Sequence, residues 1–209
     1  DAALGARLLT LDDPVQARAI AERLDQLNAE RQAIEKAMLD EAEAQVGPEL
    51  AEGGPPVIVV AQEKWHPGIV GLLAARLKEK ARRPAFAIAI NPNGTGTGSG
   101  RSIPGIDLGR LVRKAVEEGL VVKGGGHAMA AGITIDKAKL GGLRAFFETE
   151  IAGKVTELLA DSELEIDGAV AAGGATLDLI EQVERAGPYG SGNPAPLFVL
   201  PNHRLAHTR

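Results

Sequence analysis

The stretch "PVIVVAQEKWHPGIVGLLAARLKEKARRPAFAIAI" at residues 56–90 decides the fold class. Its first seven residues (56–62) are mostly apolar and rich in β-branched side chains, which is typical of a strand buried on both faces. A segment with helical periodicity follows and ends before Pro84, and four apolar residues share one of its faces: Val70, Leu73, Ala74 and Leu77. "AFAIAI" (85–90) predicts a second buried strand.

The same alternation continues downstream. After a turn at "NPNG" (91–94), a helix is expected from Asp107 to its cap at Gly119, with one apolar face: Leu108, Leu111, Val112 and Ala115. "AAGITI" (130–135) predicts another strand, and residues 136–155 another helix. Strands alternating with helices indicate an α/β fold with a parallel or mixed sheet.

Upstream, a long helix is expected to begin after Asp13, an N-cap residue followed by proline, and to break at Gly47-Pro48. About 33 residues would span roughly 50 Å, so part of this helix should lie outside any core that the chain forms. Its narrow apolar stripe consists of Ile20, Leu24, Leu27, Ile34 and Met38. We expect a strut between two domains; a coiled-coil seam that joins two copies is the alternative.

The composition is that of an ordinary folded protein. Of its 209 residues, 44% are hydrophobic, and none is cysteine. The absence of cysteine favours a reducing cytoplasmic location, and no apolar run is long enough to cross a membrane. Because the sequence starts without methionine and ends in a strand-like segment, we expect it to be a piece of a longer protein.

Charge is strongly segregated along the chain. Residues 64–114 hold ten basic and two acidic side chains, a net charge of +8, so the remainder carries −13 of the total of −5. This local balance favours an anionic ligand. For residues 78–83 alone, a solvated helix face is the favoured explanation of the charges.

Two glycine-rich segments lie in or beside the basic region. In "GTGTGSGRS" (94–102), glycine occupies every second position, so an extended chain would have one bare face that a ligand or another backbone could approach. Arg101 and Ser102 then offer a guanidinium fork and a hydroxyl to phosphate oxygens. A flexible surface loop is the alternative.

In "GGGH" (124–127), successive glycines could turn several N–H groups into one anion-binding concavity, and His127 adds a donor. A tight turn with a core histidine is the alternative.

Three motifs, in this order and spacing, resemble the DHHA1 domain of the DHH phosphoesterase superfamily: "EKWHPGIVGLLAARL" (63–77), "GSGRSIPGIDL" (98–108) and "GGGHAMAAGITI" (124–135). "GPYGSGNPAPLF" (187–198) is similar to the segment that leads into the OB-type domain of the RecJ exonucleases. The opening stretch resembles the end of their DHH domain and its connecting helix. The resemblance implies the following division: 1–12, end of a DHH domain; 13–47, connecting helix; 55–158, DHHA1 domain; 159–209, entry into an OB-type domain.

The resemblance also implies a function. RecJ exonucleases degrade single-stranded DNA from the 5′ end in repair and recombination, with manganese or magnesium held by the DHH domain, while DHHA1 holds the phosphates of the substrate. On matching positions, the phosphate-binding residues implied here are Arg101, Ser102, Gly125, Gly126, His127 and His66. The implied partners are single-stranded DNA and a DHH domain in cis, with no membrane.

Metal ligands are not expected in this sequence. It has no "DHH" triplet and no clustered Asp and His at a spacing that could hold two metal ions. His203 and His207 would share a strand face without acidic partners, so we disfavour them as ligands. We therefore expect no cofactor to be bound by this chain and no DNA hydrolysis by it alone.

Two other functions are the alternatives. A DHHA1-bearing phosphodiesterase acting on oligoribonucleotides or cyclic dinucleotides is not expected to carry "PYGSGNPAPLF", and a non-catalytic module like the tail of alanyl-tRNA synthetase is not expected to carry the opening helix. Only Trp65 and Phe86 are aromatic in the basic stretch, so binding should depend on phosphates, ignore sequence and weaken with salt.

Overall fold

The computed structural model describes residues 2–51, 53–160, 165–190 and 192–204. The chain divides after Ala160 into two units. The first contains a sheet with its helices, and the second is a small unit built from the C-terminal residues.

A five-stranded mixed sheet forms the centre of the first unit, in the order β1-β2-β3-β5-β4. Only β1 (Ile58–Glu63) and β2 (Ala85–Ile90) are parallel. The three other strands pair antiparallel: β3 (Thr95–Arg101), β5 (Ala130–Asp136) and β4 (Lys123–His127). The predicted mixed α/β fold is confirmed. It has two further strands: β4, which the sequence had not predicted, and β3, for which an extended chain and a flexible loop were both left open.

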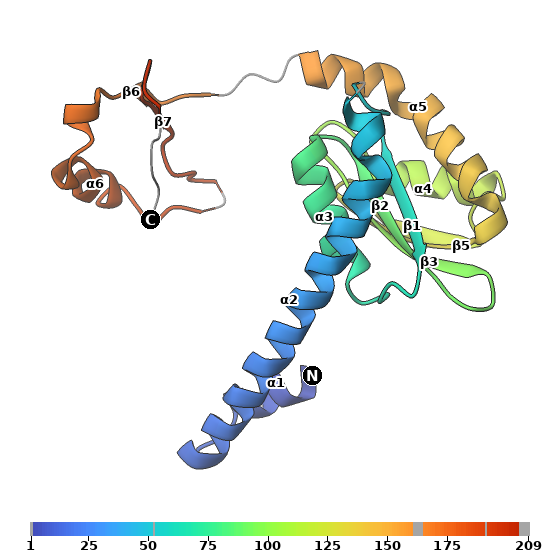
Figure 1. Ribbon diagram of the computed structural model, residues 1–209, viewed down its shortest axis with the longest axis horizontal. Coiled ribbons are helices and arrows are strands. Elements are labelled where there is room, and N and C mark those ends of the chain that lie inside the picture. Colours follow the sequence, from blue (N-terminus) through green and yellow to red (C-terminus); the bar gives the residue numbers. More distant parts are fainter. Residues whose placement is uncertain (1, 52, 161–164, 191, 205–209) are drawn as a thin grey trace. The chain divides into compact units, whose positions relative to one another are not determined.

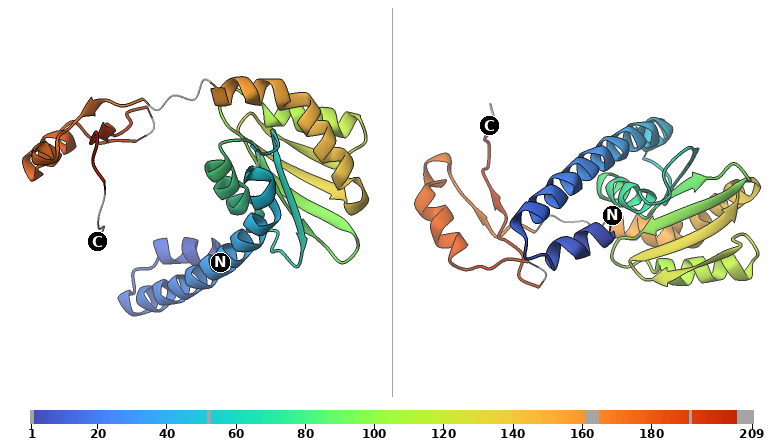
Figure 2. Two further views of the ribbon diagram at one scale, coloured as in Figure 1. Left: turned by 45° about the horizontal axis from the view of Figure 1, so that its top comes forward. Right: turned by 90° about the horizontal axis from the view of Figure 1, so that it is seen from below.

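Helices cover both faces of this sheet (Figure 2). On one face, α3 (Val70–Ala81) and the C-terminal part of α2 (Pro14–Ala51) share a core with β1 and β2. On the other face lie α4 (Leu108–Glu117) and α5 (Leu140–Ala160), the latter entered through the 3-10 turn η1 (Lys137–Lys139). The predicted apolar faces of α3 and α4 are the buried ones.

The alternating glycines of β3 lie against the core between the sheet and helices α4 and α5. A methyl group at Gly96, Gly98 or Gly100 would clash with buried side chains of β2, and the tightest case is Gly100, 2.4 Å from Cε1 of Phe86. The Phe86 ring stacks on Phe147 of α5 with centroids 4.9 Å apart. Large side chains from the neighbouring strands therefore occupy the space above β3, and glycine is the residue that leaves room for them.

Helix α2 begins as predicted but does not end as predicted. Asp13 caps its first turn, because its Oδ1 accepts the N–H of Val15 at 2.9 Å. The helix then runs through Gly47-Pro48 to Ala51, so the predicted break at residue 47 is wrong. A proline removes one helical hydrogen bond, and here tertiary packing outweighs that loss, because Val46 is buried in the core beside α3.

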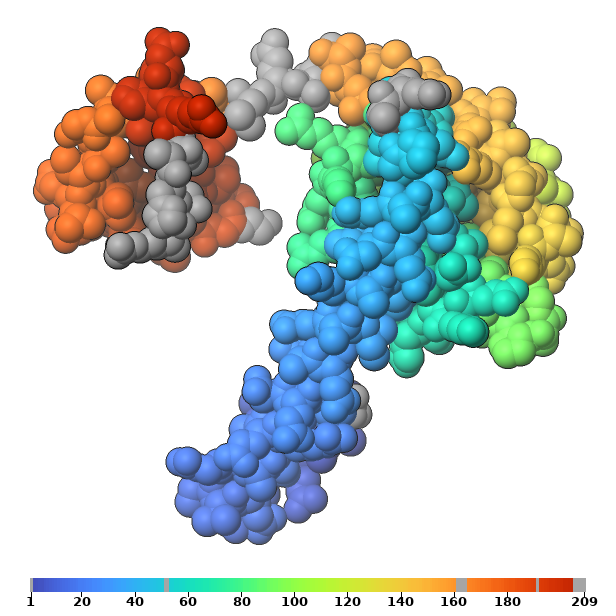
Figure 3. Space-filling view, viewed as in Figure 1, coloured from blue at the N-terminus to red at the C-terminus, as the bar shows by residue number. Residues whose placement is uncertain are grey.

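The N-terminal half of α2 extends beyond the sheet together with α1 (Ala2–Leu9), which packs beside it (Figures 1 and 3). This confirms that part of the long helix lies outside the main core.

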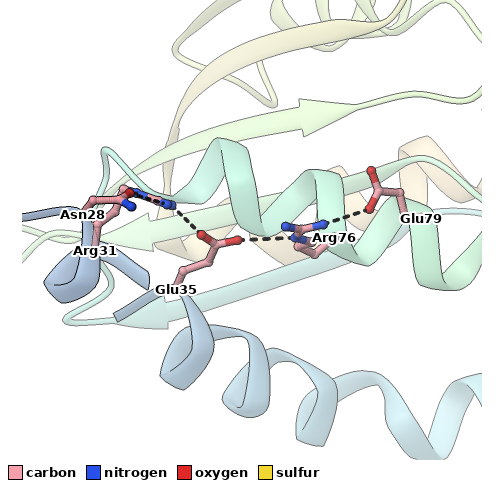
Figure 4. Close-up of polar contacts among 5 residues, drawn as sticks. All are labelled: Asn28, Arg31, Glu35, Arg76 and Glu79. Carbon is pink, nitrogen blue, oxygen red and sulfur yellow. Dashed lines mark hydrogen bonds and ion pairs between the residues drawn. The ribbon is translucent and has the colours of Figure 1, made fainter. Parts of the chain in front are cut away.

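Ion pairs connect the C-terminal half of α2 to helices α3 and α5. Glu35 accepts Arg31 Nη1 at 2.6 Å and Arg76 Nε of α3 at 3.4 Å, as Figure 4 shows. Further along α2, Glu43 pairs with Lys80 of α3 at 2.6 Å. Glu49 pairs with Arg144 of α5.

The second unit contains a two-stranded parallel sheet of β6 (Gly168–Ala169) and β7 (Phe198–Val199), the 3-10 turn η2 (Ala172–Gly174) and helix α6 (Leu177–Glu184). Thr176 caps α6 by accepting the N–H of Leu179 at 3.2 Å. The sequence also predicts a strand near 163–170, a helix from about Thr176 to Ala186 and a strand at "LFVL" (197–200). Helix α6 and strand β7 lie within the last two of these segments. In the first segment only β6 is a strand among the described residues, and residues 163–164 lie outside them.

Candidate nucleic-acid interface

The register of the sheet brings Arg101 and His127 to one end of three neighbouring strands. Arg101 of β3 and His127 of β4 are both paired with Ala130 of β5. Directly opposed residues in antiparallel strands place their side chains on the same face. With strands about 4.8 Å apart, Arg101 and His127 stand about 10 Å apart along one face of the sheet.

Between and beyond these two residues, this face of the sheet is open. Helix α3 packs on β1, β2 and β3, whereas β5 and β4 lie beyond it. Gly125 has no atom within 4 Å of its Cβ position, and at Gly132 the nearest atom is Gly98 O at 3.9 Å. We call the surface formed by Lys123, Gly125, His127, Ala130, Gly132 and Thr134 the open sheet face.

Arg101 lies at the border of the open sheet face with part of its guanidinium group unused. Its Nη1 donates to Ser99 Oγ and to the carbonyl oxygen of Gly100, each at 2.9 Å. A guanidinium carries five N–H donors, so Nε and Nη2 retain three that have no acceptor among the described residues. This arrangement holds the side chain in place and leaves donors for a bidentate contact with an anion.

The N-terminus of α3 adds donors beside Arg101. Arg101 Nη2 lies 3.0 Å from the Cβ position of Gly71, in the first turn of the helix. No side chain caps this helix, and the N–H groups of Val70 and Gly71 have no acceptor in the described part of the chain. Free N–H groups and the helix dipole favour negative charge at this position.

His127 is exposed at the other side of the open sheet face. Its Nδ1 accepts the N–H of Met129 at 3.3 Å. In the neutral ring the proton therefore resides on Nε2, which is left to donate outward.

His66 shows the same arrangement in a different place. Its Nδ1 accepts the N–H of Gly68 at 3.1 Å, in the loop before α3. The ring lines a groove of about 520 Å³ between this loop and the middle of α2, next to Leu27 and Arg31. Among the described residues, no hydrogen bond or ion pair joins His66 to Arg101 or His127.

Ser102 is placed differently from Arg101. It is only 2% exposed, and its hydroxyl donates to the carbonyl oxygen of Ile106 at 2.7 Å. Its own N–H donates to the carbonyl oxygen of Met129 at 3.0 Å. Ser102 thereby joins the end of β3 to the loop before α4 and to the turn after His127.

The structure contradicts two expectations for the glycine-rich segments. The bare face of β3 faces the core rather than a ligand, because Phe86, Ile88 and Ile133 fill it. The segment "GGGH" forms strand β4 and not an anion-binding turn, because residues 123–127 pair along β5. Gly126 cannot take a side chain, since its Cβ would lie 2.2 Å from the carbonyl oxygen of Ala130.

Sequence reasoning missed Ser99 and Gly71. Ser99 lies two residues before Arg101, so the period of a strand places it on the face of Arg101, whereas Ser102 follows the last residue of β3. That signal was present in the sequence. Gly71 could not have been found in this way, because its contact with Arg101 depends on how α3 crosses the sheet.

Metal binding is not supported by the residues that the structure describes. Among them, no group of three or more His, Cys, Asp or Glu side chains could hold a metal ion. His203 Nδ1 lies 2.7 Å from the carbonyl oxygen of Pro201, and His207 falls outside the described residues. No described helix is long and apolar enough to span a membrane.

Comparisons with known families match two segments of the chain. Residues 54–153 match the DHHA1 domain, which includes the sheet, the open sheet face and most of α5. Residues 166–209 match the RecJ OB domain. The fold is thus a DHHA1-type mixed sheet that follows a long helix and precedes an OB-type segment.

Curated relatives and solved structures agree with this division. The single-stranded-DNA-specific exonuclease RecJ of Dickeya dadantii is 38% identical over 211 residues, and that of Escherichia coli is 34% identical over 213. Each match covers 95% of this chain and 35% of the relative, so the chain spans about a third of their length. The crystal structure of Thermus thermophilus RecJ with Mn²⁺ superposes with a TM-score of 0.73 at 32% identity, over 95% of this chain and 28% of that one. The Mg²⁺ complex gives 0.72 at 32%, over 94% and 30%.

Proposed function

We propose, since this chain belongs to the RecJ family, that its open sheet face holds the phosphate backbone of single-stranded DNA for 5′ to 3′ exonucleolytic degradation in repair and recombination. The relatives are single-stranded-DNA-specific exonucleases by name. The contribution of the described residues is to bind and orient the substrate.

The observation that carries this proposal is the convergence of unused donors beside Gly71. Arg101 contributes three N–H groups, and the N-terminus of α3 contributes those of Val70 and Gly71. Ser99 Oγ holds the guanidinium by accepting from Arg101 Nη1. A phosphate has oxygens for both sets, and a guanidinium fork paired with a helix N-terminus matches its geometry and charge.

His127, Gly125 and Gly132 extend the proposed phosphate-binding surface away from Arg101. The Nε2–H of His127 serves a second phosphate about 10 Å along the face from Arg101, a distance set by two strand spacings. Gly125 and Gly132 leave the intervening surface free of side chains, so a sugar-phosphate chain can lie directly on the sheet. Because the open sheet face has no aromatic side chain, we expect phosphate contacts to dominate and base identity to matter little.

We assign a separate role to each of Ser102, Gly126 and His66. Ser102 and Gly126 keep the strand ends of Arg101 and His127 in register, through a buried hydroxyl and a position that excludes any side chain. His66 offers its Nε2–H from the loop before α3 to a neighbouring part of the substrate.

Hydrolysis in the whole protein is proposed to use manganese or magnesium, as the metal complexes of related RecJ proteins suggest. The described residues do not form a site for these ions. The role that we propose for this chain is therefore confined to holding and placing the strand.

Binding of a short 5′-phosphorylated single strand, measured by fluorescence anisotropy at low and moderate salt, tests the proposal. Loss of charged hydrogen bonds worth about 1.5–3 kcal/mol should weaken binding by Arg101→Ala about 10- to 100-fold. His127→Ala should weaken it less, and Lys36→Ala on the exposed surface of α2 is the matched control. Equal binding by all four proteins would exclude this site.

A further inference from the structure

Lys123 and Thr134 lie side by side on the open sheet face, at the opposite end of β4 from His127. The register pairs Lys123 of β4 directly with Thr134 of β5. Directly opposed residues share one face of a sheet, with Cβ atoms about 4.5–5.5 Å apart. The neighbours of Thr134 along β5, Ile133 and Ile135, are buried in the core. Thr134 and Lys123 therefore project from the opposite face.

Both side chains are available to a ligand. Lys123 is exposed and Thr134 is half-buried. Among the described residues, neither the ammonium group of Lys123 nor the hydroxyl of Thr134 has a hydrogen bond or an ion pair. By contrast, Lys137 of η1 pairs with Glu63 at 2.7 Å. An ammonium group and a hydroxyl on neighbouring strands can donate to oxygens of the same phosphate.

The surface between Lys123 and His127 is bare. On this face of β4 only Gly125 lies between them, and no atom lies within 4 Å of its Cβ position. Gly132, opposite Gly125 on β5, is also open, because the nearest atom to its Cβ position is Gly98 O at 3.9 Å. Four residues of a β-strand span about 13 Å. A sugar-phosphate chain that reaches His127 can therefore follow β4 to Lys123 without meeting a side chain.

We propose that Lys123 and Thr134 form a third phosphate contact, so that the bound DNA turns at His127 and runs along β4 to Lys123. The inference rests on the proposed function, in which Arg101 and His127 hold two phosphates across the β-strands. Asp136 limits this path, since it lies two residues beyond Thr134 on the same face. Its carboxylate has no partner among the described residues, so it repels a phosphate placed further on.

A contact at Lys123 changes the salt dependence of binding. Each phosphate contact on single-stranded DNA adds about 0.7 to the slope of log K against log salt concentration. Lys123→Ala should therefore lower this slope by about 0.7, and Lys123→Arg, which keeps the charge, should retain it. Thr134→Val removes only a hydroxyl, so it should weaken binding about 2- to 10-fold and leave the slope unchanged.

Two controls match these variants. Thr97 is another exposed threonine on the same face, opposite Thr134, but it lies on β3, two strands away from Lys123. Thr97→Val should therefore bind DNA within about twofold of the wild type, as is usual for surface substitutions. Lys36→Ala removes one charge from the exposed surface of α2 and should leave the slope unchanged.

Neutral linkages identify the phosphate that Lys123 contacts. In a DNA of about 5 nucleotides, near the short end of single-strand sites, one phosphodiester at a time is replaced by an uncharged methylphosphonate. One replacement should weaken binding by the wild type and have no further effect on Lys123→Ala. A second should behave likewise with His127→Ala, and it should lie between the first and the linkage that Arg101 contacts. A His127 linkage outside this interval would refute the turn at His127.

Failure of the inference and failure of the proposed function give different results. If Arg101→Ala weakens binding while Lys123→Ala keeps the salt slope, or loses affinity equally for every linkage, the contact at Lys123 is refuted and the proposed function stands. If Arg101→Ala binds as the wild type does, the proposed function fails, and the contact at Lys123 fails with it. Circular dichroism of each variant separates loss of contact from loss of fold.

Discussion

Gly100→Ala tests whether the glycines of β3 serve the core rather than a ligand. The new methyl group would lie 2.4, 2.6 and 2.8 Å from three carbons of the Phe86 ring. That ring is fully buried and is stacked on Phe147, so it has no free space to move into. Overpacking of this kind costs about 1–3 kcal/mol.

For a domain of this size, 1 kcal/mol lowers the melting temperature by about 2–4 °C, so Gly100→Ala should lower it by about 2–12 °C in differential scanning calorimetry. Gly132→Ala is the matched control, because its nearest atom would be 3.9 Å away on the open sheet face. Its melting temperature should stay within about 2 °C, as is usual for surface substitutions. Equal melting temperatures for the two variants would refute the assignment of the two glycine sets to opposite faces.

Three further predictions follow from other parts of the structure. Gly125→Val should keep the melting temperature, since no atom lies within 4 Å of that Cβ, but should weaken single-strand binding at least tenfold in anisotropy by covering the open sheet face. Arg83→Leu should destabilise the chain by about 1.5–3 kcal/mol in urea unfolding, because the buried guanidinium donates to the carbonyl oxygens of Gly53 and Pro55. Hydrogen bonds from the Gln16 side chain and the Val15 N–H lower the pKa of Asp13 below 3.8, so its capping of α2 should persist above that pH and be lost as pH falls through the lower folded-state value. A protection factor of the Val15 amide, taken relative to unstructured exchange at the same pH, that does not fall in acid would contradict this.

The chain alone is also predicted not to hydrolyse DNA. No set of described side chains can hold the metal ions of related RecJ proteins. Manganese-dependent release of nucleotides by the purified chain, co-eluting with it and unchanged by further purification, would contradict that prediction.

Elements with strong periodicity could be predicted from the sequence. The four apolar residues expected on one face of α3 are its buried ones, and "AFAIAI" coincides with β2, which is buried along its whole length. Strand β4 could not be predicted in this way, because "KGGGH" has neither β-branched residues nor apolar alternation. It is a strand because β5 pairs with it and α4 packs closely on it. These are tertiary contacts, and the local sequence pattern does not reveal them.

The candidate site could be predicted in part for similar reasons. Arg101 and His127 could be selected by charge and by their glycine-rich surroundings, and the register places both opposite Ala130. Their companion was chosen by adjacency as Ser102, whereas the hydrogen bond of Arg101 goes to Ser99, two residues away on the same strand face. Reading "GTGTGSGRS" as a strand throughout would have found it.

The central claim is that a phosphate backbone lies directly on the open sheet face. Amide NMR spectra recorded during titration with a short 5′-phosphorylated single strand test it directly. Gly125 and Gly132 lie on the open sheet face, and Gly71 lies beside Arg101 at its border. The account predicts the largest shifts at these three amides and none at Gly141 or Gly153 of α5, which have no atom within 4 Å of their Cβ positions. Saturable shifts confined to α5, with Gly71, Gly125 and Gly132 unchanged, would contradict it.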